Sequence, residues 1–271
     1  MTEEDRKHDS RPIWISVEVQ PEQCYHWQLG PFQLWVKRIE DEWFIASEAL
    51  ADPETEASIE VGSIIPEPEA IEWERWVIKD PDNTLHLAPL MPDRPVVVRP
   101  VVPMHIPHGQ QASFYVSIPL WIQIAVGKEK SMVLCEKPGI MLSNTWFGNP
   151  VEGELCYSLN TKARRELEDC TVKPYRALCP VVIRNDHAKE LNFERLCIRT
   201  DHLSIYEGDN QLVTNEVNVT YHGEEKLSRI KYGKKPPSLG NIKGKLSDPR
   251  KPEDSLIKLS FNSLMSHTFY G

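Results

Sequence analysis

The chain has 271 residues, of which 40% are hydrophobic and 26% charged, a composition that excludes a disordered chain and a length that suits two domains. Its 40 acidic residues outnumber its 31 basic ones, and the net charge of −9 argues against a general nucleic-acid binder, because such proteins neutralise phosphates with Lys and Arg. No run of eighteen apolar residues occurs and the six cysteines form no Cys-x-x-Cys pair, so we expect a cytoplasmic protein with reduced thiols, no structural zinc and no transmembrane segment.

The first predicted domain is a small β module over residues 11–90. Its apolar runs are short, and the ones on either side of the acidic residues 40–42 predict a hairpin. Residues 47–72 are acidic and contain three prolines, which favours an exposed connection. Strands are expected at residues 13–19, 32–38, 43–46, 76–78 and 85–87.

The second predicted domain covers residues 91–232. Residues 95–126 are rich in β-branched and aromatic side chains and are divided by proline and glycine, which is typical of short strands. One short helix is expected after a cap at Asn160 or Thr161, with Ala163 and Leu167 on one face. Further strands are expected at residues 178–184, 192–198, 202–206, 211–213 and 217–221. The fold class is therefore predicted as all-β and mainly antiparallel, a β-sandwich with a small N-terminal β module and one short helix.

The C-terminal part of the chain predicts a linker and a tail. Residues 233–254 mix Lys with Pro and Gly, which is typical of a flexible basic linker. Residues 255–271 carry apolar side chains at spacings compatible with an amphipathic helix. This tail could pack on its own domain or dock on a partner, and the sequence leaves both open.

The most motif-like stretch is residues 145–158, which reads Thr-Trp-Phe-Gly, then Pro150, then Gly-Glu-Leu-Cys-Tyr-Ser. It resembles a succession found in a prokaryotic family, the domain of unknown function 432. The resemblance extends upstream through residues 114–121 and downstream through 179–185, and it covers most of residues 11–232. It implies no reaction, cofactor or catalytic residue. It does point to an association with mechanosensitive-type channel proteins.

Four residues in this stretch are candidates for a ligand or interaction surface. They are Trp146, Phe147, Glu154 and Tyr157. The three aromatic side chains offer large apolar areas, and together with the carboxylate they could form a binding ridge. The alternative is a tight connection between two strands, in which glycine and proline shape the turn and the aromatic side chains belong to the core.

The other residues that could bind a metal or act as a nucleophile do not form a recognisable site in the sequence. His105 and His108, with His86 and His202, could gather around a metal, but side chains three residues apart on a strand point to opposite faces. Cys156 lies close to Glu154, and a neighbouring carboxylate raises a thiol's pKa, which disfavours a nucleophile. No serine-nucleophile or phosphate-loop motif occurs. We therefore predict no catalytic residue, no metal and no cofactor.

The sequence favours a protein-interaction or regulatory module with an unidentified protein partner, linked to a membrane channel through the resemblance and not to nucleic acid. The alternative is a small-molecule or metal-dependent enzyme or sensor whose site is assembled from residues distant in the sequence. The oligomeric state is not predicted.

Overall fold

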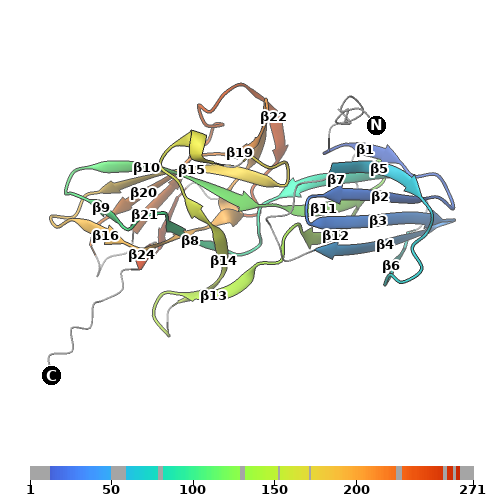
Figure 1. Ribbon diagram of the computed structural model, residues 1–271, viewed down its shortest axis with the longest axis horizontal. Coiled ribbons are helices and arrows are strands. Elements are labelled where there is room, and N and C mark those ends of the chain that lie inside the picture. Colours follow the sequence, from blue (N-terminus) through green and yellow to red (C-terminus); the bar gives the residue numbers. More distant parts are fainter. Residues whose placement is uncertain are drawn as a thin grey trace, which may run out of the picture. The chain divides into compact units, whose positions relative to one another are not determined.

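The computed structural model describes residues 13–49, 59–78, 82–128, 132–151, 153–170, 172–223, 228–252, 255–258 and 261–262. These residues form mostly antiparallel sheets, and the helical segments among them are short 3₁₀ turns such as η3 (Leu167–Asp169) and η4 (Thr200–His202). The predicted all-β class is confirmed (Figure 1). The chain divides into two compact units, one comprising the chain up to Leu90 with Leu120–Met141, and the other comprising Met91–Pro119 with the chain from Leu142 onward.

The first unit contains a five-stranded antiparallel sheet. Its strands, in sheet order, are β5 (Ile59–Ile65), β2 (Cys24–Leu29), β3 (Phe32–Ile39), β4 (Glu42–Ala49) and β6 (Glu74–Val77). The predicted hairpin is confirmed, because β3 pairs with β4 from Phe32 opposite Ala49 to Ile39 opposite Glu42. The prediction of an exposed connection over 47–72 is wrong for β5, which pairs with β2 and buries Val61.

A four-stranded sheet completes the first unit. Its strands, in sheet order, are β1 (Ser16–Glu18), β7 (Thr84–Leu90), β11 (Trp121–Val126) and β12 (Met132–Pro138). β11 pairs antiparallel with β7, and both strands contribute fully buried side chains such as Leu85 and Ile124. The first unit therefore includes two strands from the stretch that the sequence assigned to the second domain.

The larger sheet of the second unit is built on the long pair β10 (Gln111–Pro119) and β15 (Arg176–Asn185), which is antiparallel along its whole length. The other edge of β15 pairs in parallel with β19 and then β20. The remaining strands of this sheet extend it on both sides. The added strands are β19 (Leu212–Thr214), β20 (Val217–Tyr221), β18 (Ile205–Gly208), β22 (Ile242–Ser247), β21 (Ser228–Tyr232) and β23 (Ser255–Lys258).

The second sheet of this unit positions the candidate site. Its strands, in sheet order, are β13 (Ser143–Phe147), β14 (Glu154–Ala163), β8 (Val96–Pro100), β17 (Arg195–Ile198) and β24 (Phe261–Asn262). β14 is parallel to β8, and β8 is antiparallel to β17. A separate pair joins β9 (Met104–Ile106) to β16 (Leu191–Phe193). β13 and β14 form a hairpin that is visible in yellow-green in Figure 1.

Three local predictions in the second unit are wrong for the same reason. The expected helix with Ala163 and Leu167 on one face is absent, because β14 continues to Ala163 and pairs with β8, and only η3 follows. Within the expected linker, β22 pairs with β18. Within the expected helical tail, β23 pairs with β21 and β24 with β17, while 259–260 and 263–271 lie outside the described residues. Backbone pairing with distant strands overrides the local pattern at each place.

Candidate functional site

The β13–β14 hairpin carries all four predicted surface residues but divides them between its two faces. Phe147 lies opposite Glu154, and Tyr157 lies opposite Asn144. Because directly opposed residues share a face and successive residues alternate, Phe147 and Glu154 lie on one face and Trp146 and Tyr157 on the other. The four residues therefore do not form one continuous ridge.

The face with Trp146, here called the outer face, exposes apolar side chains. Trp146 is 47% exposed, its cross-strand neighbour Leu155 is 43% exposed, and Val151 in the connecting turn is 90% exposed. The indole Nε1 of Trp146 donates a hydrogen bond of 2.9 Å to the carbonyl oxygen of Asn149. A Cβ at Gly153 would overlap the indole ring and lie 2.7 Å from that same carbonyl. The indole is therefore held in one position by the tight turn beneath it.

Tyr157 belongs to the same strand face but makes polar contacts of its own. Its hydroxyl donates a hydrogen bond of 2.9 Å to Asp93 Oδ1, and the Arg94 guanidinium lies 5.5 Å from the centre of its ring. Burial, and then the Asp93 hydrogen bond, raise the pKa of the Tyr157 hydroxyl above its usual value. Tyr157 thus ties the strand to the 93–94 segment.

The opposite face, here called the inner face, carries a buried cluster of two thiols and a carboxylate. Phe147, Val97, Cys156 and Cys197 pack together in a buried apolar group. The Cys156 and Cys197 sulfurs are 3.9 Å apart, and the Cys197 sulfur is 4.0 Å from Glu154 Oε1. Within the described part of the chain, these three donor atoms form the one group of at least three His, Cys, Asp or Glu ligand atoms close enough to hold a metal ion, all within 4.8 Å of one another.

The strand order explains how this cluster forms from distant residues. Glu154 and Cys156 are two residues apart on β14, so both point to the inner face. Cys197 lies on β17, and Arg199 is the first residue after that strand. These two residues are also two positions apart, so they share a face as well. β8 lies between β14 and β17, and its Val97 packs against the two cysteines.

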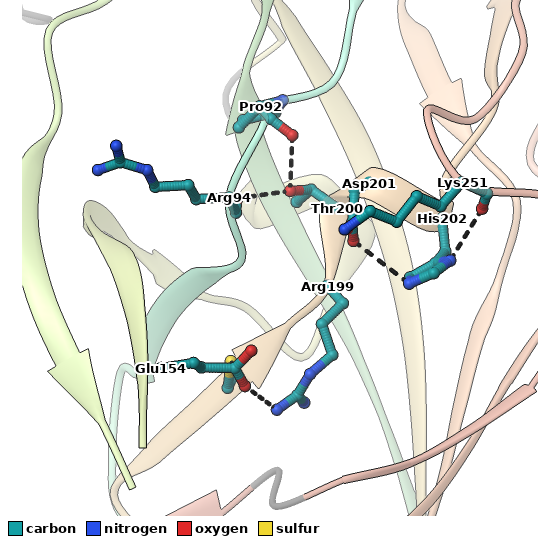
Figure 2. A network of polar contacts seen from close by, with 9 residues as sticks. Pro92, Arg94, Glu154, Arg199, Thr200, Asp201, His202 and Lys251 are labelled. Carbon is teal, nitrogen blue, oxygen red and sulfur yellow. Dashed lines mark hydrogen bonds and ion pairs between the residues drawn. The ribbon is translucent and has the colours of Figure 1, made fainter. Parts of the chain in front are cut away.

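The electrostatics of the cluster keep the Cys197 thiol neutral. Arg199, which is only 4% exposed at its side chain, forms an ion pair with Glu154, whose side chain is 33% exposed (Figure 2). Burial raises the pKa of Cys197 well above its usual range, and the contact with Cys156 raises it further, while Arg199 partly opposes both effects. A thiol that is protonated at neutral pH is a poor nucleophile, so Cys197 does not fit the role of a catalytic nucleophile.

The segment that carries Arg199 continues into a buried polar network. The Thr200 hydroxyl lies 2.8 Å from the carbonyl oxygen of Arg94 and 3.2 Å from that of Pro92. Next to it, Asp201 accepts a hydrogen bond of 2.8 Å from Lys251 Nζ. Figure 2 marks the contact between Asp201 and the His202 ring, and the one between that ring and the Lys251 carbonyl oxygen. These contacts hold η4, which directly follows Arg199.

The four histidines considered as metal ligands are not gathered into one site. His86 lies in the first unit and His105, His108 and His202 lie in the second, where each contacts a different partner. These partners are the Glu190 carboxylate for His105 and the backbone carbonyls of His187 and Lys251 for His108 and His202, respectively.

Sequence reasoning missed Cys197 and Arg199, and it treated Glu154 and Cys156 as an unpromising pair. Nothing in the spacing links Cys156 with Cys197, because β15 and β16 lie between them in the chain. The two cysteines come together only because β14 and β17 both pair with β8. One signal was available. Glu154-x-Cys156 and Cys197-x-Arg199 each place two polar or ionisable side chains on one face of an extended segment. Such pairs are unusual in otherwise apolar strands and indicate a candidate site.

Comparison with known proteins identifies the family. Residues 13–266, nearly the whole chain, match the family described as "Protein of unknown function (DUF432)". Neither the curated proteins nor the solved structures include a match to this chain. The resemblance seen in residues 145–158 is confirmed, and the chain belongs to the DUF432 family.

Proposed function

We propose that this protein is a protein-interaction module and that its contact surface is the outer face of the β13–β14 hairpin, formed by Trp146, Val151 and Leu155. The observation that carries the proposal is the exposure of a large aromatic side chain that is nevertheless fixed by a hydrogen bond and a tight turn. Rigid aromatic side chains supply much of the binding energy in protein interfaces, because little entropy is lost when they are buried.

The position of β13 indicates the chemistry of the partner. β13 stands at the end of the sheet order, so its outer edge pairs with no other strand among the described residues. An edge strand binds an extended segment of another chain through main-chain hydrogen bonds, and alternate apolar side chains of that segment pack on the exposed face. The partner is accordingly a protein that presents an extended segment with apolar residues at alternate positions.

A membrane channel protein is one candidate for this partner, because the family resemblance implies an association with such channels. None of the helical segments in the described part of this chain has the length and apolar character needed to cross a membrane.

The experiment places a photo-crosslinking residue at Val151 of the full chain and identifies the cross-linked peptides by mass spectrometry. We expect one partner, joined through an extended apolar segment. In the binding assay with that partner, Trp146→Ala should weaken affinity by about 2 kcal/mol or more, roughly thirtyfold.

The matched control is Val172→Ala, which shortens an exposed apolar side chain elsewhere in the same unit and should leave the affinity unchanged. Equal affinity for wild type and Trp146→Ala, or cross-links that scatter over many unrelated proteins, would refute the proposed surface.

A further inference from the structure

We propose that Cys156, Cys197 and Glu154 form a zinc-binding site on the inner face of the β14–β8–β17 sheet. This inference does not rest on the interaction surface proposed above, which lies on the other face of the hairpin. It rests on the convergence of two sulfur donors and one oxygen donor from strands that are distant in the sequence.

The separation of the two sulfurs matches tetrahedral zinc coordination, and the carboxylate lies close enough to join them after a side-chain movement. Zinc–sulfur bonds of about 2.3 Å at a tetrahedral angle place two sulfur ligands about 3.8 Å apart, and the Cys156 and Cys197 sulfurs are 3.9 Å apart. A carboxylate oxygen bound to the same ion lies about 3.5 Å from each sulfur, compared with 4.0 Å between Glu154 Oε1 and the Cys197 sulfur. Glu154 lies within 4.8 Å of the Cys156 sulfur, so its partly exposed side chain must move by roughly half an ångström toward Cys197 and by up to about 1.3 Å toward Cys156 to bind the same ion.

The charges around the site favour a divalent ion. Without metal, the Glu154 carboxylate is balanced by the Arg199 guanidinium. The two cysteines bind zinc as thiolates, whose two negative charges balance the dication, so the site stays electrically neutral. A monovalent copper ion bound by both thiolates would leave one uncompensated negative charge in buried surroundings, which is costly. Magnesium and calcium are disfavoured by sulfur ligands.

The strand order disfavours a disulfide as the purpose of the thiol pair. β8 separates β14 from β17, so the two cysteines lie on strands that are not neighbours and do not form a directly opposed cross-strand pair. A disulfide joins Cα atoms about 4.4–6.8 Å apart, so its formation would require the backbone to move. All six cysteines are free in the structure.

Three protein ligands leave the fourth tetrahedral position for water or another ligand, as in zinc sites that keep an open coordination position. Glu154 supplies the route to this position, because its side chain is one third exposed whereas both cysteines are buried. Arg199 acts as a positioning residue that orients the carboxylate through their ion pair.

The experiment titrates the reduced full-length protein with Co²⁺ as the spectroscopic probe and then displaces Co²⁺ with Zn²⁺. We expect one equivalent of Co²⁺ with a thiolate charge-transfer band, which zinc abolishes. Loss of a residue that merely supports a ligand costs about 10- to 100-fold in affinity, so Cys156→Ser and Cys197→Ser should each cost more than about 100-fold. Cys170→Ser removes a thiol elsewhere in the same unit and should bind as the wild type does.

Two further readouts keep the test decisive if a serine variant fails to fold. In the wild-type protein, at a urea concentration that opens the second unit, zinc should slow the alkylation of Cys156 and Cys197 and leave that of Cys170 unchanged, as read by peptide mass spectrometry. Glu154→Gln keeps the side-chain shape and should weaken zinc binding at least about tenfold while both thiolates still bind. The proposal fails if wild-type protein takes up no stoichiometric zinc, if zinc protects neither thiol, or if the oxidised protein contains a Cys156–Cys197 disulfide instead.

Discussion

At the scale of single residues, the Arg199 guanidinium is buried and carries a charge. A buried cation requires a counter-charge, and Glu154 provides one from a strand on the other side of β8. The same carboxylate lies beside two thiols, so one side chain serves both the ion pair and the donor cluster. Substitution at Glu154 therefore changes both stability and metal binding, and measurements on metal-free protein isolate the effect on stability.

Glu154→Leu should lower the free energy of unfolding by about 2 kcal/mol, because it removes a counter-charge from a buried guanidinium while part of the pair is screened by water. Urea unfolding of metal-free protein measures the change. Glu168→Leu, at an exposed position of the same unit, is the control and should shift stability by less than about 0.5 kcal/mol. Equal shifts in the two variants would contradict the stabilising role of the Glu154–Arg199 pair.

At the scale of secondary-structure elements, the β13–β14 hairpin joins a rigid turn to two functionally different faces. Gly153 makes this possible, because its missing side chain leaves room for the Trp146 indole against the Asn149 carbonyl. The indole also packs over the loop that connects the two strands. The fixed position of Trp146 on the outer face therefore depends on Gly153.

Gly153→Ala should destabilise the protein by about 1–3 kcal/mol, since the added Cβ overlaps the indole and a backbone oxygen. We expect a changed tryptophan emission as well, because the Trp146 ring must move. Gly244→Ala provides the matched control, as a Cβ there would meet no atom within 4 Å. If both alanine variants unfold at the wild-type urea concentration, the close packing of Gly153 on Trp146 is wrong.

The elements also show where sequence patterns suffice and where they fail. The hairpin of β3 and β4 was predictable, because two apolar runs lie next to each other in the chain on either side of an acidic turn. The strand ending at Ala163 was not, because its helical spacing of Ala163 and Leu167 is overridden by pairing with β8. For the site, Glu154 was selected from the sequence, but Cys197 could not be, because only the sheet order brings it to Cys156.

At the scale of the whole molecule, the chain leaves its first unit after Leu90 and returns to it at Leu120. The strands formed on that return, β11 and β12, complete the sheet that β7 begins. Proline-rich connections marked many strand ends in the sequence, but they could not show that β11 pairs with a strand some thirty residues earlier. Composition alone thus gave the fold class and not the division of the chain.

A fragment that ends at Leu90 should fail to fold cooperatively, because β7 loses its partner β11 and the apolar residues Leu85 and Leu87 lose the packing that this strand provides. Circular dichroism during urea titration is the measurement, and the full chain is the comparison. A cooperative transition in the fragment would show that the residues up to Leu90 are a complete domain and that β11 and β12 are dispensable to it.

The central claim is that β8 holds β14 and β17 so that Cys156, Cys197 and Glu154 converge on a single ion. The most direct measurement is a crystal structure of the protein soaked in zinc, with diffraction recorded on both sides of the zinc absorption edge. The account predicts one anomalous peak at this cluster, about 2.3 Å from each of the two sulfurs and about 2 Å from the Glu154 carboxylate. Two sulfurs bonded to each other, or a cluster with no anomalous peak while zinc binds elsewhere, would contradict it.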